Sequence, residues 1–229
     1  LFTHLRVEQN IAFGLRHLAR AARSQRVAEL LDMVRLGDVA RRYPHELSGG
    51  EQQRIALARA LAPDPAIVLL DEPFASLDET LRDDVRNDVV AALARQRTPA
   101  VLVTHDRAEA LTLGHRVAVM RAGRVLQCGE PTEVYERPVD RFVASFLATT
   151  SFIAEPDGSV LVARPHDITL VPGGSAIVVD HAYLGATHRY TARRPDGTEF
   201  VADHASPMFA IGDSCEPTLT ADHPLHRLS

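Results

Sequence analysis

A short turn in the first quarter of the chain has the composition of a phosphate-binding helix start. A serine, two glycines, a carboxylate and an amide follow one another there: Leu47, Ser48, Gly49, Gly50, Glu51 and Gln52. Ser48 and Glu51 have the spacing of a capping box, so we expect a helix to begin at Ser48. A helix N-terminus carries roughly half a positive charge, and glycines let the backbone approach an anion closely. The turn therefore predicts a phosphate receptor; simple helix capping is the alternative.

Two acidic residues follow an unbroken apolar run further along the chain. Ile67–Leu70 predicts a strand buried on both faces, and Asp71 and Glu72 stand at its carboxyl end. In open α/β sheets, ligands bind at the carboxyl ends of the strands. One of these two carboxylates can hold Mg²⁺ there, usually through water, and its neighbour can act as general base on a water, worth about 10²–10⁴-fold in rate. The alternative is a strand that ends in ordinary polar turn residues.

A histidine stands at the end of the next apolar run. Residues 100–103 predict a second buried strand, and His105 follows it after Thr104. An imidazole at this place can donate a hydrogen bond to a phosphate oxygen. The chain holds 11 histidines, so His105 is informative only in combination with Asp71 and Glu72.

Helical patterns dominate residues 1–62. Val27 opens an apolar stripe that continues at positions 30, 31 and 34, which is typical of an amphipathic helix. Gly37 lies near the end of this stripe and is a helix stop signal. The helix that begins at Ser48 must stop before Pro63, because proline removes a backbone donor and clashes with the preceding turn.

Strands then alternate with helices. Leucine or valine at every fourth position predicts a helix over 81–93, between the strands at 67–70 and 100–103. A helix at 107–113 and a strand at 117–120 continue the series. This alternation predicts an α/β fold with a parallel sheet covered by helices.

After about residue 150 the pattern changes to short β-rich segments. The strand candidates are Val160–Ala163, Ala176–Val179, Arg189–Ala192 and Glu199–Ala202. Three proline- and glycine-containing turn signals lie near them: Pro156-Asp157-Gly158, Pro172-Gly173-Gly174 and Pro195-Asp196-Gly197. The region predicts a small all-β domain, with its boundary near Thr149–Ser151.

Composition excludes several kinds of chemistry. All 25 basic residues are arginine, so no lysine is available for a phosphate or a Schiff base. The two cysteines, Cys128 and Cys215, are too few for a disulfide framework or a zinc site. The sequence contains no apolar run of about 18 residues, the length that would predict a membrane span. Residues 151–229 hold 5 arginines and 10 acidic residues, which account for the net charge of −5 and argue against nucleic-acid binding there.

In combination, the three chemical features resemble the ATP-binding-cassette (ABC) ATPases. Residues 47–52 match the signature motif, residues 67–72 match the Walker B strand with its catalytic glutamate, and His105 matches the switch histidine. Ser76-Leu77-Asp78 matches the D-loop. The resemblance extends throughout residues 1–150.

The resemblance implies a fold class and two domains. The expected fold is α/β: a partial P-loop NTPase, that is, an ABC cassette with its helical subdomain, followed by a small all-β C-terminal domain. The cassette is expected over residues 1–149 and a TOBE-like domain over residues 150–229. Residues 163–168 resemble the "RPxx" element of such domains in bacterial importers. Residues 1–15 look like the stretch just after the Q-loop.

Finer similarities point to the solute. Residues 71–78 look more like the iron, polyamine, sulfate and phosphonate importers than like the sugar importers. Residues 7–15, together with residues 183–186, lean towards ferric iron. The sequence does not identify the solute itself, because other subunits select it.

The resemblance also implies cofactors and roles. In this family two subunits sandwich ATP and Mg²⁺ head to tail. Residues 48–52 and Asp78 would contact nucleotide, with the signature residues capping the γ-phosphate held by the opposite subunit. Asp71 would orient the metal, Glu72 would polarise the water, and His105 would contact the γ-phosphate. The implied enzyme is a transporter ATPase.

Partners and location follow from the same resemblance. The implied partners are a second ATPase subunit, transmembrane permease subunits and, indirectly, an extracytoplasmic solute-binding protein, with no nucleic acid. The implied location is the cytoplasmic face of the bacterial plasma membrane, as a peripheral subunit. Homodimer and heterodimer remain equally open.

A P-loop, however, has no counterpart in the sequence. Its backbone amides cradle the phosphates and its lysine reaches the β and γ oxygens, but the chain contains no Gly-x-x-x-x-Gly-Lys and no lysine. The chain also begins at Leu1 rather than Met, inside a periodic segment. We therefore expect an N-terminally truncated cassette that is inactive by itself. The alternatives are a non-catalytic remnant and, less favoured, a soluble ABC ATPase without a transport role.

Overall fold

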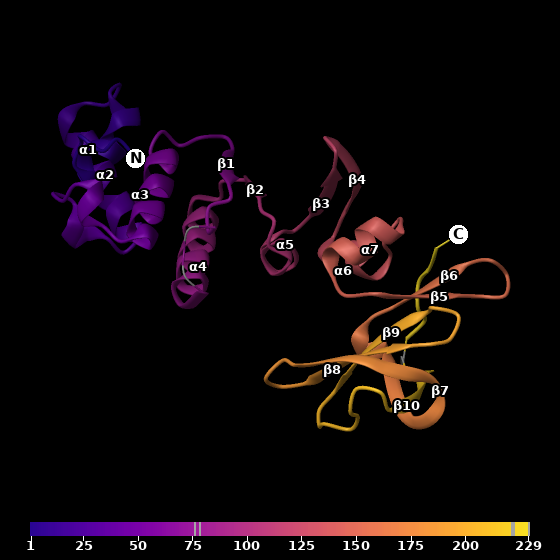
Figure 1. Ribbon diagram of the computed structural model, residues 1–229. Helices are drawn as coiled ribbons and strands as arrows, with labels where there is room; N and C mark the ends of the chain where they lie inside the picture. Colours follow the sequence, from indigo (N-terminus) through magenta and orange to yellow (C-terminus); the bar gives the residue numbers. More distant parts are fainter. Residues whose placement is uncertain (76, 78, 221–222, 229) are drawn as a thin grey trace. The chain divides into compact units, whose positions relative to one another are not determined.

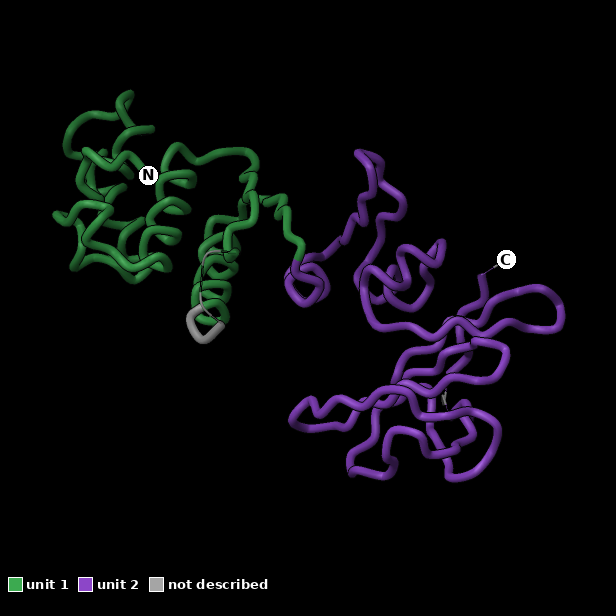
Figure 2. The backbone as a smooth tube through the Cα atoms, in the orientation of Figure 1, with its two compact units in different colours: residues 1–105 green, residues 106–229 purple. Residues whose placement is uncertain are grey.

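The computed structural model describes residues 1–75, 77, 79–220 and 223–228. The chain divides into two compact units, residues 1–105 and residues 106–229, shown in green and purple in Figure 2. This division differs in position from the 149/150 boundary expected from the sequence, which stays a prediction. Within the described part of the chain, no helix has the length and apolar character needed to cross a membrane.

Unit 1 consists of helices and one pair of parallel strands (Figure 1). Its helices are α1 (Val7–Ala12), α2 (Arg20–Met33), α3 (Gly49–Leu61) and α4 (Glu79–Gln96). Its strands are β1 (Val68–Asp71) and β2 (Ala100–Val103), and short 3₁₀ turns lie at Phe13–Leu15, Gly37–Val39 and Pro44–Glu46. The order β1, α4, β2 confirms the alternation predicted for residues 67–103, but the predicted strand at 117–120 does not extend this parallel sheet, because residues 117–121 pair antiparallel with residues 124–129.

The apolar stripe of α2 forms as predicted. Val27, Leu30 and Leu31 are buried against the rest of unit 1. The prediction that Gly37 stops this helix is wrong, however. The helix ends at Met33, and Arg35, with φ of 58°, makes the left-handed turn, while Gly37 starts a 3₁₀ turn. The chain reverses at Arg35 because the backbone amide of Leu36 bonds back to the carbonyl of Leu31, as helix C-caps do.

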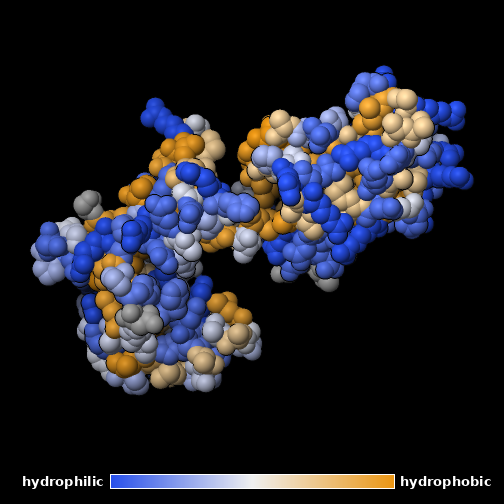
Figure 3. Space-filling model, turned by 180° about the vertical axis from the view of Figure 1, so that it is seen from behind, coloured by the Kyte–Doolittle hydropathy of each residue, from blue (hydrophilic) through white to orange (hydrophobic). Residues whose placement is uncertain are grey.

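Strands β1 and β2 pair in parallel, with Leu70 opposite Leu102 and Asp71 opposite Val103. The prediction that both strands are buried on both faces is wrong: Leu69 is 74% exposed and Val103 is 54% exposed. Figure 3 shows hydrophobic residues at the surface where these strands run. Burial of a parallel strand needs neighbours on both faces and edges. In the described residues, this sheet contains these two strands alone.

Unit 2 begins with a mixed segment and continues as a β-rich one. The first segment comprises α5 (Arg107–Leu113), β3 (Val117–Arg121), β4 (Arg124–Gly129), α6 (Pro131–Glu136) and α7 (Arg141–Leu147). The β-rich segment comprises β5 (Ser151–Ala154), β6 (Val160–Ala163), β7 (Ile168–Tyr183), β8 (His188–Arg193), β9 (Glu199–His204), β10 (Ser214–Leu219) and β11 (Arg227–Leu228), with a 3₁₀ turn at Pro165–Asp167.

These strands form two antiparallel sheets, in the orders β10-β7-β8-β9 and β11-β6-β5. Their common core is mainly aliphatic and contains the buried rings of Tyr190 and Phe200. The four strand candidates predicted from the sequence are all confirmed. The predicted turn at residues 172–174 is wrong, because β7 continues through it with an irregular register: Cys215 pairs with Pro172 but Ser214 with Ile177.

Glycine is needed at this irregularity. Gly174 has φ of 103°, and a Cβ atom there would lie 2.6 Å from the Glu216 carboxylate. The glycine therefore permits a bulge in a long strand rather than a reversal of the chain. The partner strand that stabilises the bulge is distant in sequence, so local turn signals misidentify it.

A buried arginine joins the two segments of unit 2. Arg164 is 4% exposed, and its guanidinium donates to the carbonyls of Ala144 (2.8 Å) and Tyr135 (2.9 Å) and to the Thr150 hydroxyl. Its backbone amide donates to the Asp167 carboxylate at 2.7 Å. Burial lowers the pKa of Arg164. This side chain thus binds carbonyls near the ends of both α6 and α7, and at Ala144 it adds to the helical bond from the Ala148 amide.

We predict that Arg164→Met lowers the free energy of unfolding by about 2–4 kcal/mol, because the hydrogen bonds of a buried guanidinium are lost. The matched control is Arg193→Met, which removes an exposed ion pair with Glu199 and should cost less than about 1 kcal/mol. Urea unfolding followed by circular dichroism measures both. Equal effects of the two substitutions would contradict the assignment.

Candidate functional site

Unit 1 carries all the predicted site residues that the structure describes. They form two groups: the turn before α3, which we call the signature turn (residues 47–52), and the carboxyl ends of β1 and β2, which we call the strand edge (Asp71, Glu72 and His105). Asp78, together with Ser76 of the predicted D-loop, lies outside the described residues.

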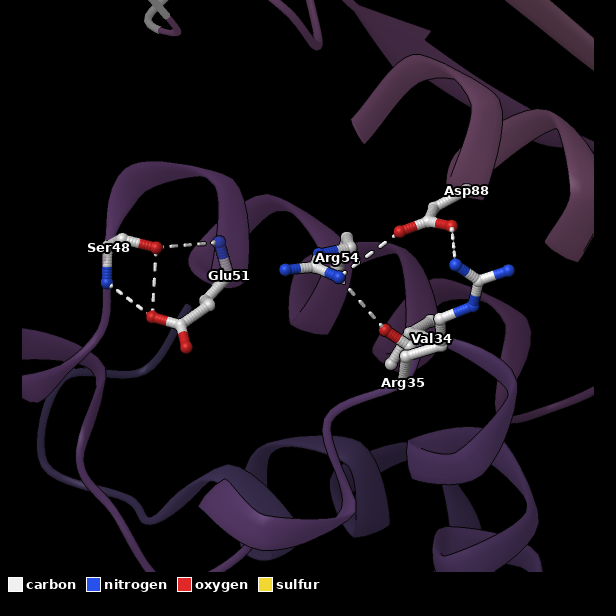
Figure 4. Close-up of polar contacts among 6 residues, drawn as sticks. All are labelled: Val34, Arg35, Ser48, Glu51, Arg54 and Asp88. Carbon is white, nitrogen blue, oxygen red and sulfur yellow. Dashed lines mark hydrogen bonds and ion pairs between the residues drawn. The ribbon is translucent and has the colours of Figure 1, made fainter. Parts of the chain in front are cut away.

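The signature turn is closed by a capping box, as predicted (Figure 4). The backbone N–H of Ser48 donates to a Glu51 carboxylate oxygen at 2.7 Å, and the Ser48 hydroxyl donates to the same oxygen at 2.8 Å. The hydroxyl in turn accepts from the Glu51 amide at 3.3 Å. Hydrogen bonds from the backbone and hydroxyl of Ser48 lower the pKa of Glu51. In the chain by itself, the Glu51 carboxylate therefore occupies donors that a phosphate would use.

The remaining residues of the turn divide by exposure. Ser48 and Gly49 are exposed, whereas Gly50 is buried. A Cβ atom at Gly50 would lie 3.0 Å from a methyl group of Val85 on α4, so glycine is needed here for close packing of α3 on α4. The Gln52 side chain donates to the Leu47 carbonyl at 3.1 Å and closes the turn from the other side.

The strand edge brings Glu72 and His105 together. The Glu72 amide donates to the Val103 carbonyl at 2.9 Å and extends the β1–β2 ladder by one bond. Glu72 then turns with φ of 43°, in the left-handed region. Its carboxylate lies 3.2 Å from His105 Nδ1, and both side chains are largely exposed. A carboxylate only accepts, so Nδ1 carries a proton in this contact.

The backbone of Glu72 is strained. A non-glycine residue in the left-handed region costs of order 1 kcal/mol and persists only where the surroundings enforce it. Here the enforcing contact is the ladder bond to Val103. Such outliers cluster at functional sites, and Glu72 is one of five described non-glycine residues with positive φ, of which it alone belongs to the predicted site.

Asp71 fits a Mg²⁺ ion in the donor type that it offers. It is the last residue of β1, and its carboxylate is exposed at the carboxyl end of a parallel strand pair. Hard carboxylate oxygens are the ligands that Mg²⁺ takes from proteins, with water and phosphate oxygens completing the shell. ATP itself fits less well, because no lysine and no P-loop accompany these groups in the chain.

Sequence reasoning missed two polar residues that hold unit 1 together. Asn10 is fully buried, and its amide donates to the carbonyls of Phe2 and Leu5, which fixes the N-terminal segment on α1. Arg54 binds Asp88 of α4. A polar residue between Val7 and Ile11, on the apolar face of α1, was the available signal for Asn10; nothing local signals the partner of Arg54.

Comparison with known proteins identifies two family segments. Residues 1–75 match the family model described as ABC transporter, and residues 161–225 match the one described as TOBE domain. Helices α1–α3 with the signature turn lie in the first segment, and most of the β-rich sheets lie in the second. The expected fold class, a partial ABC cassette followed by a small all-β domain, is thereby confirmed.

Curated relatives agree with both matches. The putrescine transport ATP-binding protein PotG of Escherichia coli (strain K12) is 48% identical over 204 residues, which cover 86% of this chain and 53% of that protein. An Fe(3+) ions import ATP-binding protein FbpC of Pseudomonas fluorescens is 54% identical over 148 residues, covering 64% and 42%. A sulfate/thiosulfate import ATP-binding protein CysA of Pseudomonas putida is 40% identical over 212 residues, covering 88% and 64%.

The helical part, the signature turn and the strand edge thus define part of an ABC cassette joined to a TOBE segment. The chain belongs to the family of ATP-binding subunits of ABC importers, as the sequence predicted. It spans about half the length of curated relatives that it matches, 53% of the PotG protein and 42% of the FbpC protein.

The lowered pKa of Glu51 predicts a pH-dependent contribution of the signature turn. A carboxylate with a depressed pKa stabilises the fold above its unfolded pKa of about 4.3, and this contribution disappears as the pH falls through the lower folded pKa. Glu51→Gln should therefore lower the free energy of unfolding by about 0.5–1 kcal/mol at pH 7.

The difference between Glu51→Gln and the parent chain should vanish below the folded pKa. Urea unfolding across the acid range measures it. Glu29→Gln, the same charge change at an exposed position of α2, should shift the free energy by less than about 0.5 kcal/mol at pH 7. A constant Glu51→Gln deficit at all pH values would show that the carboxylate charge does not close the turn.

The strained backbone of Glu72 predicts a substitution that stabilises the fold. Glu72→Gly should raise the free energy of unfolding by about 0.5–1 kcal/mol, because glycine adopts a φ of 43° without the clash of a Cβ atom. Glu8→Gly, in the α-helical backbone of α1, should lower it by about 1 kcal/mol. Thermal unfolding of both variants measures these changes in the free energy of unfolding. A destabilised Glu72→Gly would contradict the strain.

Proposed function

We propose that the chain supplies two parts of the ATP-hydrolysing site of an ABC importer subunit. The signature turn contributes phosphate-binding donors, and the strand edge contributes metal-binding and water-activating carboxylates. The contact between Glu72 and His105 at the end of a parallel strand pair is the observation that carries this proposal. The P-loop belongs to a part of the site that the chain itself does not contain.

At the strand edge, each side chain has a distinct role. When bound beside Asp71, Mg²⁺ supplies positive charge that stabilises the transferred phosphoryl group. The Glu72 carboxylate accepts a proton from the attacking water. His105 orients Glu72 through Nδ1; to donate from Nε2 to the γ-phosphate as well, its ring must carry both protons.

The signature turn acts on the nucleotide of the opposite subunit. The Ser48 hydroxyl and the amides that open α3, at residues 49 and 50, donate to the γ-phosphate, and Gln52 keeps the turn closed. The Glu51 carboxylate has to release Ser48 as the phosphate arrives, because one hydroxyl proton serves one acceptor. Asp78 completes the nucleotide contacts from the D-loop.

The proposed partners and location are those of an importer subunit. A second ATPase subunit forms a head-to-tail dimer with this one, permease subunits couple it to transport, and a solute-binding protein acts through them. The proposed place is the cytoplasmic face of the membrane, as a peripheral subunit. The names of the relatives, which describe transport and import ATP-binding proteins, support this assignment.

The proposed solute class is a small charged species. The names of the relatives cover putrescine, spermidine, ferric ions and sulfate or thiosulfate, and none of these has a clear lead in identity. Ferric iron is the member of this class that residues 7–15 and 183–186 favour in the sequence. Uptake of iron, polyamine and sulfate in a strain with the gene deleted distinguishes them.

The direct test joins this chain to a cassette N-terminal segment that carries a P-loop. We expect the joined protein to hydrolyse ATP, and Glu72→Gln to lower kcat by about 10²–10⁴-fold, since the variant loses its general base. Glu29→Gln should leave kcat unchanged. Hydrolysis by Glu72→Gln at the parental rate would refute the assignment of the base.

A further inference from the structure

Arg54 lies on α3 and connects this helix to α4. It stands two residues after Gln52, and its Nη1 atom lies 3.2 Å from a carboxylate oxygen of Asp88 (Figure 4). The same nitrogen donates to the Val34 carbonyl, just past the end of α2, at 3.4 Å. The side chains of Arg54 and Asp88 are only 19% and 17% exposed, so water screens this pair much less than a surface pair.

A second contact lies one turn away on the same two helices. Gly50 packs against Val85, where a Cβ atom would come within 3.0 Å. Gly50 and Arg54 are four residues apart on α3, and Val85 and Asp88 are three apart on α4, so each pair lies on one helix face. The signature turn is therefore fixed to α4 at two points, one by shape and one by charge.

Asp88 is also reached by Arg35, whose Nη1 atom lies 3.5 Å from its other oxygen. This third contact differs in kind, because the Arg35 side chain is 72% exposed. An exposed ion pair contributes little. Arg35 therefore provides a control that shares the partner carboxylate but lies on neither α3 nor α4.

The hydrogen bonding of the Arg54 side chain is incomplete. Its Nε atom is buried and has no hydrogen-bond acceptor among the described residues. Leaving a buried donor unsatisfied is costly, and native structures retain such atoms rarely. The retained cost fits a contact that sets the position of a functional turn rather than one that maximises stability.

We infer that the Arg54–Asp88 pair positions the signature turn relative to α4. Arg54 is a positioning residue: it reaches no nucleotide-binding group itself and acts through the first turn of α3. The inference rests on the proposed function for the role of the turn, but its structural content is measurable without ATP.

Amide hydrogen exchange of the chain as it exists provides the test. Arg54→Gln should speed exchange of the first hydrogen-bonded amides of α3, residues 52–54, by about tenfold or more, while residues 58–61 keep their rates. Arg54→Lys keeps a charge that can reach Asp88, and should return residues 52–54 to within about threefold of the parent. Arg35→Gln should leave them unchanged.

Two results would overturn the inference. One is unchanged exchange at residues 52–54 in Arg54→Gln; the other is an even acceleration throughout unit 1, which would show a global stabilising role only. If Arg54→Gln does not fold, Asp88→Asn removes the same pair from the α4 side and should give the same local pattern. Failure of ATP hydrolysis in the joined protein would refute the proposed function and leave this result standing.

Discussion

The parallel pairing of β1 with β2 is the constraint on which the candidate site depends. The pairing does not stop at the last strand residues, because the Glu72 amide still bonds to the Val103 carbonyl. That bond holds the backbone of Glu72 in the left-handed region and directs its carboxylate to His105, two residues beyond β2. Glu72 and His105, which are 33 positions apart in sequence, thus meet through backbone geometry. Helix α4 lies in the connection between the two strands.

The signature turn is built on the opposite electrostatic principle. The strand edge collects carboxylates, which attract a cation, whereas the start of α3 presents donors and a positive helix end. In the chain by itself the amide and the hydroxyl of Ser48 are satisfied internally by Glu51. A phosphate therefore competes with a carboxylate that is already in place. The affinity of the turn for nucleotide depends on how much more strongly the turn binds the phosphate than the Glu51 carboxylate. The contacts of Gly50 and Arg54 with α4 decide where that competition takes place.

Local interactions were predictable from the sequence and non-local ones were not. The start of α3 follows from Ser48 and Glu51, three residues apart, and its end from Pro63. The placement of Glu72 and His105 at adjacent strand ends follows from two apolar runs. By contrast, the burial of β1, the bulge at Gly174 and the partner of Arg54 depend on what lies across from them. Sequence patterns give the apolar character of Leu69 but not whether anything covers it.

The composition of the chain fits this division of the site. A surface can use arginine in place of lysine, but a P-loop requires a lysine, and the sequence contains none. The most direct measurement is steady-state turnover of Mg²⁺-ATP by the purified chain alone. We expect no turnover above the buffer rate, because the strand edge and the signature turn do not include the P-loop that binds the nucleotide phosphates. A clear rate that Glu72→Gln abolishes would contradict it.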